Sequence, residues 1–231
     1  MTLHRRVTVL LLALCFGTYL LLTNTQFVSA SGVLVETYDY QGDYITMTYP
    51  HFDGMTNQNS QEKMNKYIED AVVNSFINGI QNTVNDLSSR GFMKDSYGGK
   101  MTYKVQYIDD DFASLTIETR KDFGGAHPMR YTTGYTFNLK TGDLVPFPQI
   151  IRWDAQCRQV IYDNIVQNAK DRNLFLYPRE YPTNVAKMVL ENARYVPNYC
   201  LTGKGKFTVI FQPYDIAPYS SGTLFFEMTY K

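Results

Sequence analysis

A long stretch of the sequence repeats its apolar residues every three or four positions, between residues 64 and 87. The stripe consists of Met64, Tyr67, Ile68, Ala71, Val72, Phe76, Ile80, Val84 and Leu87. Such spacing places these side chains on one face of an α-helix. Asn59, followed three residues later by Glu62, is typical of a helix N-terminal capping pair, and Gly91 ends the pattern. The sequence therefore predicts a long amphipathic helix that buries one face.

The period of the pattern changes to two after Gly98-Gly99. Apolar and polar residues alternate there, as expected for strands of an antiparallel sheet. The expected strands, including a hairpin before the long helix and two strands at the C-terminus, are 34–38, 44–49, 101–107, 115–117, 131–139, 207–211 and 224–230.

Two shorter helices are expected in the second half of the chain. Trp153, Cys157, Ile161, Ile165 and Ala169 recur at helical spacing, and a further helix is predicted between 182 and 194, because proline is favoured in a first turn. Strands and helices occur in separate runs, which is typical of an α+β domain. We expect an antiparallel sheet packed against the long helix and the two shorter helices. Residues 31–231 form this domain, with possible subregions near 31–125 and 126–231.

The first thirty residues have the pattern of a secretory signal. Basic Arg5 and Arg6 precede the uncharged run Val7–Leu22, and Val28-Ser29-Ala30 supplies a cleavage motif. We predict residues 1–30 to be a cleaved signal peptide, with an uncleaved membrane anchor as the alternative. Either reading places the rest of the chain outside the cytoplasm: secreted, periplasmic or on the outer face of the cytoplasmic membrane.

Charge and cysteine content follow from this location. The chain has 22 Lys+Arg and 22 Asp+Glu, and removing Arg5 and Arg6 leaves 20 minus 22, a net charge of −2. A chain without basic excess is not expected to bind nucleic acid. Cys157 and Cys200 would be an even pair in an oxidising compartment, which predicts a disulfide between them. Two buried free thiols are the alternative.

Three segments resemble a known family of bacterial extracytoplasmic domains. They are Asp122-Phe-Gly-Gly-Ala-His127, Tyr135-Thr-Phe-Asn-Leu-Lys-Thr-Gly-Asp143 and Phe211-Gln-Pro-Tyr-Asp-Ile-Ala-Pro-Tyr-Ser-Ser-Gly222. The sequence is similar, over most of residues 36–231, to the domain shared by the lysozyme-sensing anti-sigma factor RsiV and the non-catalytic N-terminal region of the peptidoglycan deacetylase PdaC. The last segment is the most specific of the three.

The resemblance implies a non-catalytic binding module of the envelope whose partner is lysozyme or peptidoglycan. About six residues precede the apolar run, too few for the cytoplasmic segment of an anti-sigma factor, and the Thr-Phe-Asp-Asp-Gly type metal motif of the deacetylase is absent from the sequence. The chain is therefore not expected to be an enzyme or to need a cofactor. A cell-wall glycan hydrolase with unidentified carboxylates and a structural envelope protein remain alternatives.

Few residues are candidates for a ligand contact. His127 follows Gly124 and Gly125 in a glycine-rich loop, and such loops often carry binding groups. Tyr214 and Tyr219 lie in the Pro- and Tyr-rich C-terminal segment, where tyrosines can stack on sugar rings or anchor a protein interface. For each, a purely structural role is the alternative.

Metal binding has little support in the sequence. His51 and His127 are isolated histidines without the spacing of a zinc site. The run Asp109-Asp110-Asp111 lacks the alternation and glycine of a calcium loop, so we interpret it as a hairpin turn.

Overall fold

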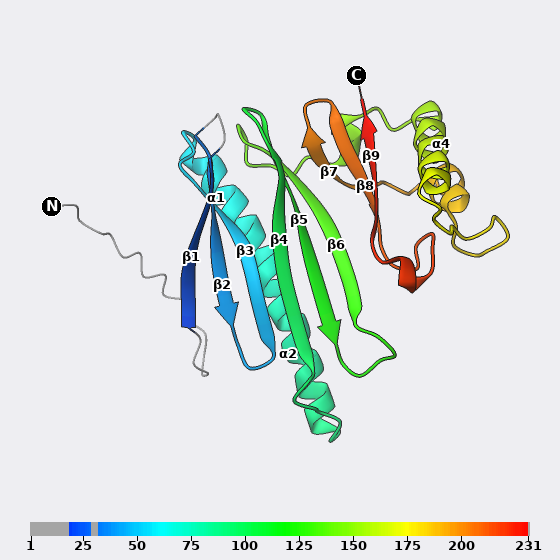
Figure 1. Cartoon of the computed structure of the whole chain (residues 1–231). Coiled ribbons are helices and arrows are strands. Elements are labelled where there is room, and N and C mark those ends of the chain that lie inside the picture. Colours follow the sequence, from blue (N-terminus) through cyan, green and yellow to red (C-terminus); the bar gives the residue numbers. More distant parts are fainter. Residues whose placement is uncertain (1–18, 29–31, 231) are drawn as a thin grey trace.

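The computed structural model describes residues 19–28 and 32–230. Within these residues, two β-sheets and several helices form the fold. Figure 1 shows the larger sheet with the long helix behind it, and the smaller sheet with helix α4 (Ala155–Asp171) to one side. The predicted α+β class is confirmed.

The larger sheet has six strands in the order in which they occur along the chain. They are β1 (Tyr19–Val28), β2 (Leu34–Gln41), β3 (Ile45–Asp53), β4 (Gly98–Ile108), β5 (Phe112–Asp122) and β6 (Met129–Asn138). Neighbours pair antiparallel except β3 and β4, which are parallel. This exception arises because the long helix returns the chain across the sheet before β4 begins, as a crossover connection does.

The helix runs without interruption through α1 (Gln58–Tyr67), the π-helical η1 (Ile68–Asn74) and α2 (Ser75–Ser89). Its N-cap is Asn57, whose side chain accepts a hydrogen bond from the Ser60 N–H at 3.3 Å. The cap predicted at Asn59 is therefore wrong by two residues. The helix itself and its buried stripe are confirmed.

The π-helical segment explains how one stripe stays buried over the whole helix. Six buried residues of the stripe lie four positions apart: Met64, Ile68, Val72, Phe76, Ile80 and Val84. At 3.6 residues per turn, each step of four residues turns the stripe by about 40° around the helix. The wider turns of a π-helix advance fewer degrees per residue, so η1 counteracts this drift and keeps the stripe on the sheet.

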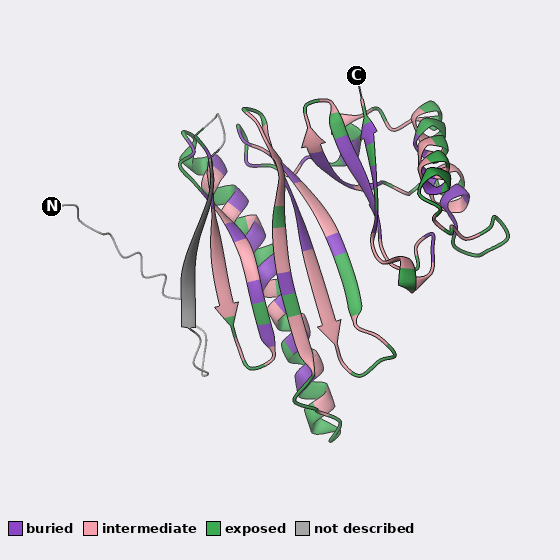
Figure 2. Ribbon diagram, viewed as in Figure 1, coloured by how far each residue is buried: buried purple, intermediate pink, exposed green. Residues whose placement is uncertain are grey.

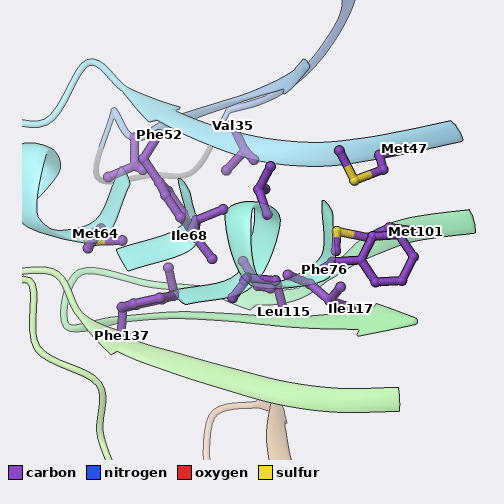
Figure 3. Packing of buried hydrophobic residues seen from close by; sticks show 14 of the residues in the cluster. Val35, Met47, Phe52, Met64, Ile68, Phe76, Met101, Leu115, Ile117 and Phe137 are labelled. Atoms are coloured by element: carbon purple, nitrogen blue, oxygen red, sulfur yellow. The ribbon is translucent and has the colours of Figure 1, made fainter. Parts of the chain in front are cut away.

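The first hydrophobic core lies between this stripe and one face of the larger sheet. Figure 3 shows Ile68 and Phe76 of the helix directed at side chains from the strands, among them Leu115 and Phe137. Figure 2 shows the same division along the helix, whose buried residues alternate with exposed ones. Burial of this apolar area is the main stabilising contribution of the first half of the chain.

The smaller sheet has three strands, β7 (Asn198–Gly203), β8 (Lys206–Phe211) and β9 (Leu224–Thr229). A second core lies between one face of this sheet and the elements α3 (Phe147–Ile150), α4 and η2 (Lys187–Glu191). The helix predicted over 153–169 is confirmed as α4. The helix predicted over 182–194 is shorter than expected: it is the π-helical η2, which has five residues.

The two sheets are joined where β7 crosses β6. A Cβ atom on Gly134 would lie 1.8 Å from the Tyr199 carbonyl oxygen, so only glycine fits at the crossing. The Asn198 side chain accepts a hydrogen bond from the Gly134 N–H (2.9 Å) and donates one to the Thr132 carbonyl (2.7 Å). These contacts fix the second sheet on the face of the larger sheet that the long helix leaves uncovered.

The predicted signal segment lies largely outside the described residues, including its basic residues, most of its apolar run and Ser29-Ala30 of the cleavage motif. The end of the apolar run forms part of β1, which pairs with β2. In the described part of the chain, none of the helices has both the length and the apolar character to cross a membrane.

Candidate functional site

The glycine-rich loop connects β5 to β6 and carries His127 at its end. Gly124 has φ +81°, and a Cβ atom there would lie 2.1 Å from the Tyr97 hydroxyl oxygen. A Cβ atom on Gly125 would have only the His127 carbonyl oxygen near it, at 3.5 Å. Gly124 therefore shapes the loop, because side chains are unfavourable at such a φ, whereas Gly125 has room for a side chain.

The C-terminal segment forms a compact turn between β8 and β9. The Gln212 N–H donates to Asp215 Oδ2 (2.7 Å), and the Tyr214 N–H donates to the Ala217 carbonyl (3.2 Å). Burial raises the pKa of the Asp215 carboxyl, and its hydrogen bond from Gln212 opposes that shift. Tyr214 has φ +74°, a conformation that costs a non-glycine residue about 1–3 kcal/mol. The turn thus holds an aromatic residue in a strained backbone conformation.

The structure brings the loop and this turn together. The His127 ring stacks on the Tyr219 ring with centroids 3.5 Å apart and planes 14° from parallel. His127 Nε2 lies 2.9 Å from the Tyr214 hydroxyl oxygen, and the Tyr219 hydroxyl donates to the Pro128 carbonyl (2.6 Å). We call His127, Tyr214 and Tyr219 the aromatic site. All three were singled out in the sequence, although the tyrosines follow His127 by about ninety residues.

Two further hydrogen bonds fix the turn against the larger sheet. Gln212 Nε2 donates to the Thr132 carbonyl (2.7 Å), and the Thr132 N–H donates to Gln212 Oε1 (2.8 Å). The amide of Gln212 thus bonds to β6 as a neighbouring strand would. Hydrogen bonds therefore hold the turn of the aromatic site against β6, which lowers the entropic cost of binding.

The chemistry available at the aromatic site is that of recognition. Tyr214 is 51% exposed, and His127 and Tyr219 are partly exposed. Aromatic faces carry negative charge density that attracts C–H groups, and phenol and imidazole groups add hydrogen bonds. Among the described residues, no group of three or more His, Cys, Asp and Glu could hold a metal ion.

The other residues considered for metal binding have structural partners. His51, on β3, stacks on Tyr38 (centroids 4.5 Å apart), and its Nε2 lies 3.3 Å from Asn65 Nδ2. Burial lowers the pKa of His51. Asp109 Oδ1 accepts hydrogen bonds from the N–H groups of Asp111 (2.9 Å) and Phe112 (2.7 Å). The acidic run is thus a side-chain-capped turn between β4 and β5, as predicted.

The predicted disulfide is wrong, because Cys157 and Cys200 are free thiols. Tyr199 and Leu201 of β7 point into the second core, so Cys200 between them points to the opposite face of the sheet. Cys157 lies in the first turn of α4 and packs against the second core. The two thiols therefore lie on opposite faces of the smaller sheet. Burial raises the pKa of the Cys200 thiol to about 12.

A polar cleft between the two sheets was not predicted from the sequence. It has a volume of about 410 Å³ and is lined by residues that include Thr102, Lys104, Gln106, Thr116, Cys200 and Thr208. Strand alternation directs Met101 and Leu115 at the long helix and their polar neighbours into this cleft. The alternation was visible in the sequence, but the crossing of the two sheets was not.

Comparisons with known proteins agree with this architecture. The family model described as Deacetylase PdaC matches residues 34–130, and the model described as Protein of unknown function (DUF3298) matches residues 152–231. The curated proteins include no significant match to the chain.

Two of the solved structures that share this fold come from bacteria. A DUF3298 family member from Bacteroides fragilis is 13% identical, with a TM-score of 0.54 over 92% of this chain and 90% of that chain. A DUF3298 family protein from Pseudomonas aeruginosa PAO1 is 12% identical, with a TM-score of 0.51 over the same shares of the two chains. At such identities the likeness concerns the fold alone. The two domain models occur in sequence order on this fold, and together they match the RsiV/PdaC-like family that the sequence resembles.

Proposed function

We propose that the chain is a non-catalytic binding module that acts outside the cytoplasm, and that its ligand is the glycan of peptidoglycan. The observation that carries this proposal is the meeting of His127, Tyr214 and Tyr219 at the surface. The match to an envelope-associated family supports the location. In this proposal the three residues of the aromatic site contact the ligand and take no part in bond cleavage.

Sugar rings present C–H groups on their faces and hydroxyl or amide groups at their edges. The faces of aromatic rings attract such C–H groups, and the phenol of Tyr214 and the imidazole of His127 offer hydrogen bonds beside them. The strained backbone of Tyr214 adds support, because strain of this kind is concentrated at functional positions. A glycan therefore finds both kinds of contact at one place.

Lysozyme is the second candidate ligand, suggested by the resemblance to a lysozyme sensor. Exposed tyrosines are common anchors of protein interfaces, and the chain without residues 1–30 carries a net charge of 20 minus 22, or −2. Lysozyme is strongly basic, so its association with the chain would weaken as salt is added. Stacking of a neutral glycan would depend little on salt.

A sedimentation assay with peptidoglycan and a column of immobilised lysozyme distinguish the two candidate ligands. The protein, as produced by a bacterial host, is mixed with insoluble peptidoglycan or passed over immobilised lysozyme, each at low and high salt. We expect binding to peptidoglycan that is retained at high salt and is weakened about tenfold or more in the Tyr214→Ala variant. Phe92→Ala is the matched control, since Phe92 is 59% exposed and lies beyond α2.

Three outcomes would contradict the glycan proposal. Salt-sensitive capture by lysozyme without binding to peptidoglycan would favour the second ligand. Release of sugars or acetate from peptidoglycan would favour an enzyme. Equal binding by the wild type and Tyr214→Ala would remove the aromatic site from the contact surface.

A further inference from the structure

A second group of aromatic rings lies next to the aromatic site. The segment between α4 and η2 carries Phe175, Tyr177 and Tyr181, which we call the aromatic loop. The rings of Tyr177 and Tyr181 stack with centroids 4.5 Å apart and planes 8° from parallel, and Phe175 meets Tyr177 edge-on at 6.5 Å. Phe175 is 63% exposed and Tyr181 is 49% exposed. Exposed rings of this size are expected to take part in binding when they cluster.

The aromatic loop is bound directly to the turn that carries the aromatic site. The Tyr177 N–H donates to the Ile216 carbonyl at 2.8 Å, and the Thr183 hydroxyl donates to the Tyr214 carbonyl at 3.4 Å. Loss of hydration raises the pKa of Tyr177, with smaller contributions from the phenols of Tyr181 and Tyr214. The two groups of rings are therefore carried by segments that are hydrogen-bonded to each other.

The backbone of Tyr181 is held by hydrogen bonds and its ring by the stack with Tyr177. Its carbonyl accepts hydrogen bonds from Asn184 Nδ2 (2.9 Å) and Lys187 Nζ (2.8 Å). Asn184 is buried, and its amide also donates to the Arg179 carbonyl at 3.0 Å. One face of the Tyr181 ring is covered by Tyr177, so a ligand can pack only on what remains exposed. A ring held in this way loses little freedom on binding.

We propose that Tyr177 and Tyr181 form a second ring-stacking subsite, so that the domain binds a glycan chain of several sugar units. This inference rests on the proposed function and adds the length of the ligand. Two separate stacks of rings, each edged by phenol hydroxyls, match a ligand that repeats apolar faces and polar edges. One sugar unit would occupy the aromatic site and a later unit of the same chain would reach Tyr181. Binding two linked units gains affinity over one unit because the second contact is intramolecular.

The experiment measures binding of N-acetylglucosamine and its β-1,4-linked tetramer by calorimetry with the full chain. We expect the wild type to bind the tetramer at least tenfold more tightly than the monosaccharide. Tyr181→Ala should weaken tetramer binding about five- to tenfold and weaken monosaccharide binding by no more than about twofold, because the aromatic site still binds one unit. Tyr214→Ala should weaken binding of both. Tyr181→Phe keeps the ring but loses the hydroxyl, so its tetramer affinity should lie between those of the wild type and Tyr181→Ala. Phe92→Ala is again the control.

The outcomes separate this inference from the proposed function. If the wild type binds neither sugar nor peptidoglycan, the proposed function fails. If it binds the tetramer and Tyr181→Ala binds it equally well, the second subsite is wrong and the first remains. If Tyr181→Ala weakens both sugars equally, the loop only supports the first site and the subsite is again wrong. Unchanged circular dichroism and melting temperature are required of each variant before its binding is compared.

Discussion

The two halves of the molecule use aromatic residues in different ways. In the first half, Phe52, Phe76 and Phe137 are buried between the larger sheet and the long helix. In the second half, Phe175, Tyr181 and Tyr214 are about half or more exposed, although a core is present there as well. The first half is covered by one long helix, and the second by α4, shorter helices and long connections. The comparison indicates that the first half supplies stability and one ring of the proposed binding surface, His127, whereas the connections of the second half supply its other rings.

The largest effect expected from this comparison is on stability. Phe137 is fully buried and packs edge-on against Phe52 at a centroid distance of 5.9 Å. Replacing Phe137 with alanine should lower the free energy of unfolding by about 3–5 kcal/mol, because it removes apolar contacts and leaves a cavity. Denaturation by urea measures this change. Phe92→Ala, at an exposed ring, should change it by less than about 0.5 kcal/mol, and equal effects of the two would refute the assigned roles.

The glycine-rich loop offers a sharper pair of variants. Gly124→Ala forces a side chain onto a positive φ and against Tyr97, so we expect a loss of about 1–3 kcal/mol in stability and weaker glycan binding. Gly125→Ala has room for its methyl group and should keep both properties within error. Chemical denaturation and the sedimentation assay test the pair. Matching results for the two variants would show that the loop does not shape the aromatic site.

The cysteines allow a test of how the second half is arranged. The partly exposed Cys157 should react with iodoacetamide at pH 8 at least about tenfold faster than the buried Cys200 in the folded protein. Mass spectrometry of peptides follows each thiol separately. After unfolding without reductant, both thiols should react. If neither reacts, the two cysteines form a disulfide after all.

A pH dependence of the free energy of unfolding follows from the burial of the Cys200 thiol. Burial raises the pKa of Cys200 from 9.0 to about 12, so the unfolded chain loses this proton at lower pH than the folded chain. The contribution of Cys200 to stability is therefore complete below pH 9 and is lost as the pH rises toward 12. The free energy of unfolding should fall less steeply over this range in Cys200→Ala. An identical slope in both proteins would contradict the burial of this thiol.

The smallest expected effect on stability concerns the strained Tyr214. Tyr214→Gly relieves the positive φ but removes the contact with His127, so the free energy of unfolding should change by no more than about 1 kcal/mol. Glycan binding should nevertheless weaken about tenfold or more. Asn173→Gly, at the other non-glycine residue with positive φ among those described (φ 50°), should leave binding unchanged. A Tyr214→Gly variant that binds normally would show that the ring does not contact the ligand.

The regular part of the fold could be predicted from the sequence because it depends on local periodicity. Positions 64 to 84 repeat at helical spacing, and β4, β5 and β6 follow the alternation of apolar residues. The parallel pairing of β3 with β4 depends instead on where a long crossover returns the chain. Local patterns contain no information about that placement, and the same holds for the π-helical turns that correct the stripe.

The candidate site shows the same division. His127, Tyr214 and Tyr219 could be singled out by residue type and loop context, but their contacts depend on how β7 crosses β6 at Gly134. The disulfide prediction failed because β7 was not predicted. The Cys200 side chain points to the face of this strand that lies away from Cys157. Tyr177 and Tyr181 carried no sequence signal, since their role depends on hydrogen bonds to a distant turn.

The most direct test of the central claim is proton NMR of the histidine rings during addition of soluble peptidoglycan fragments. The sequence contains three histidines, and His51, stacked on Tyr38 in the first half, serves as the internal control. Variants His127→Gln and His51→Gln assign the signals. We predict that the His127 signal shifts as fragments are added and that the His51 signal does not move. An unmoved His127 signal under conditions where the fragments bind would contradict the claim that the aromatic site recognises the glycan.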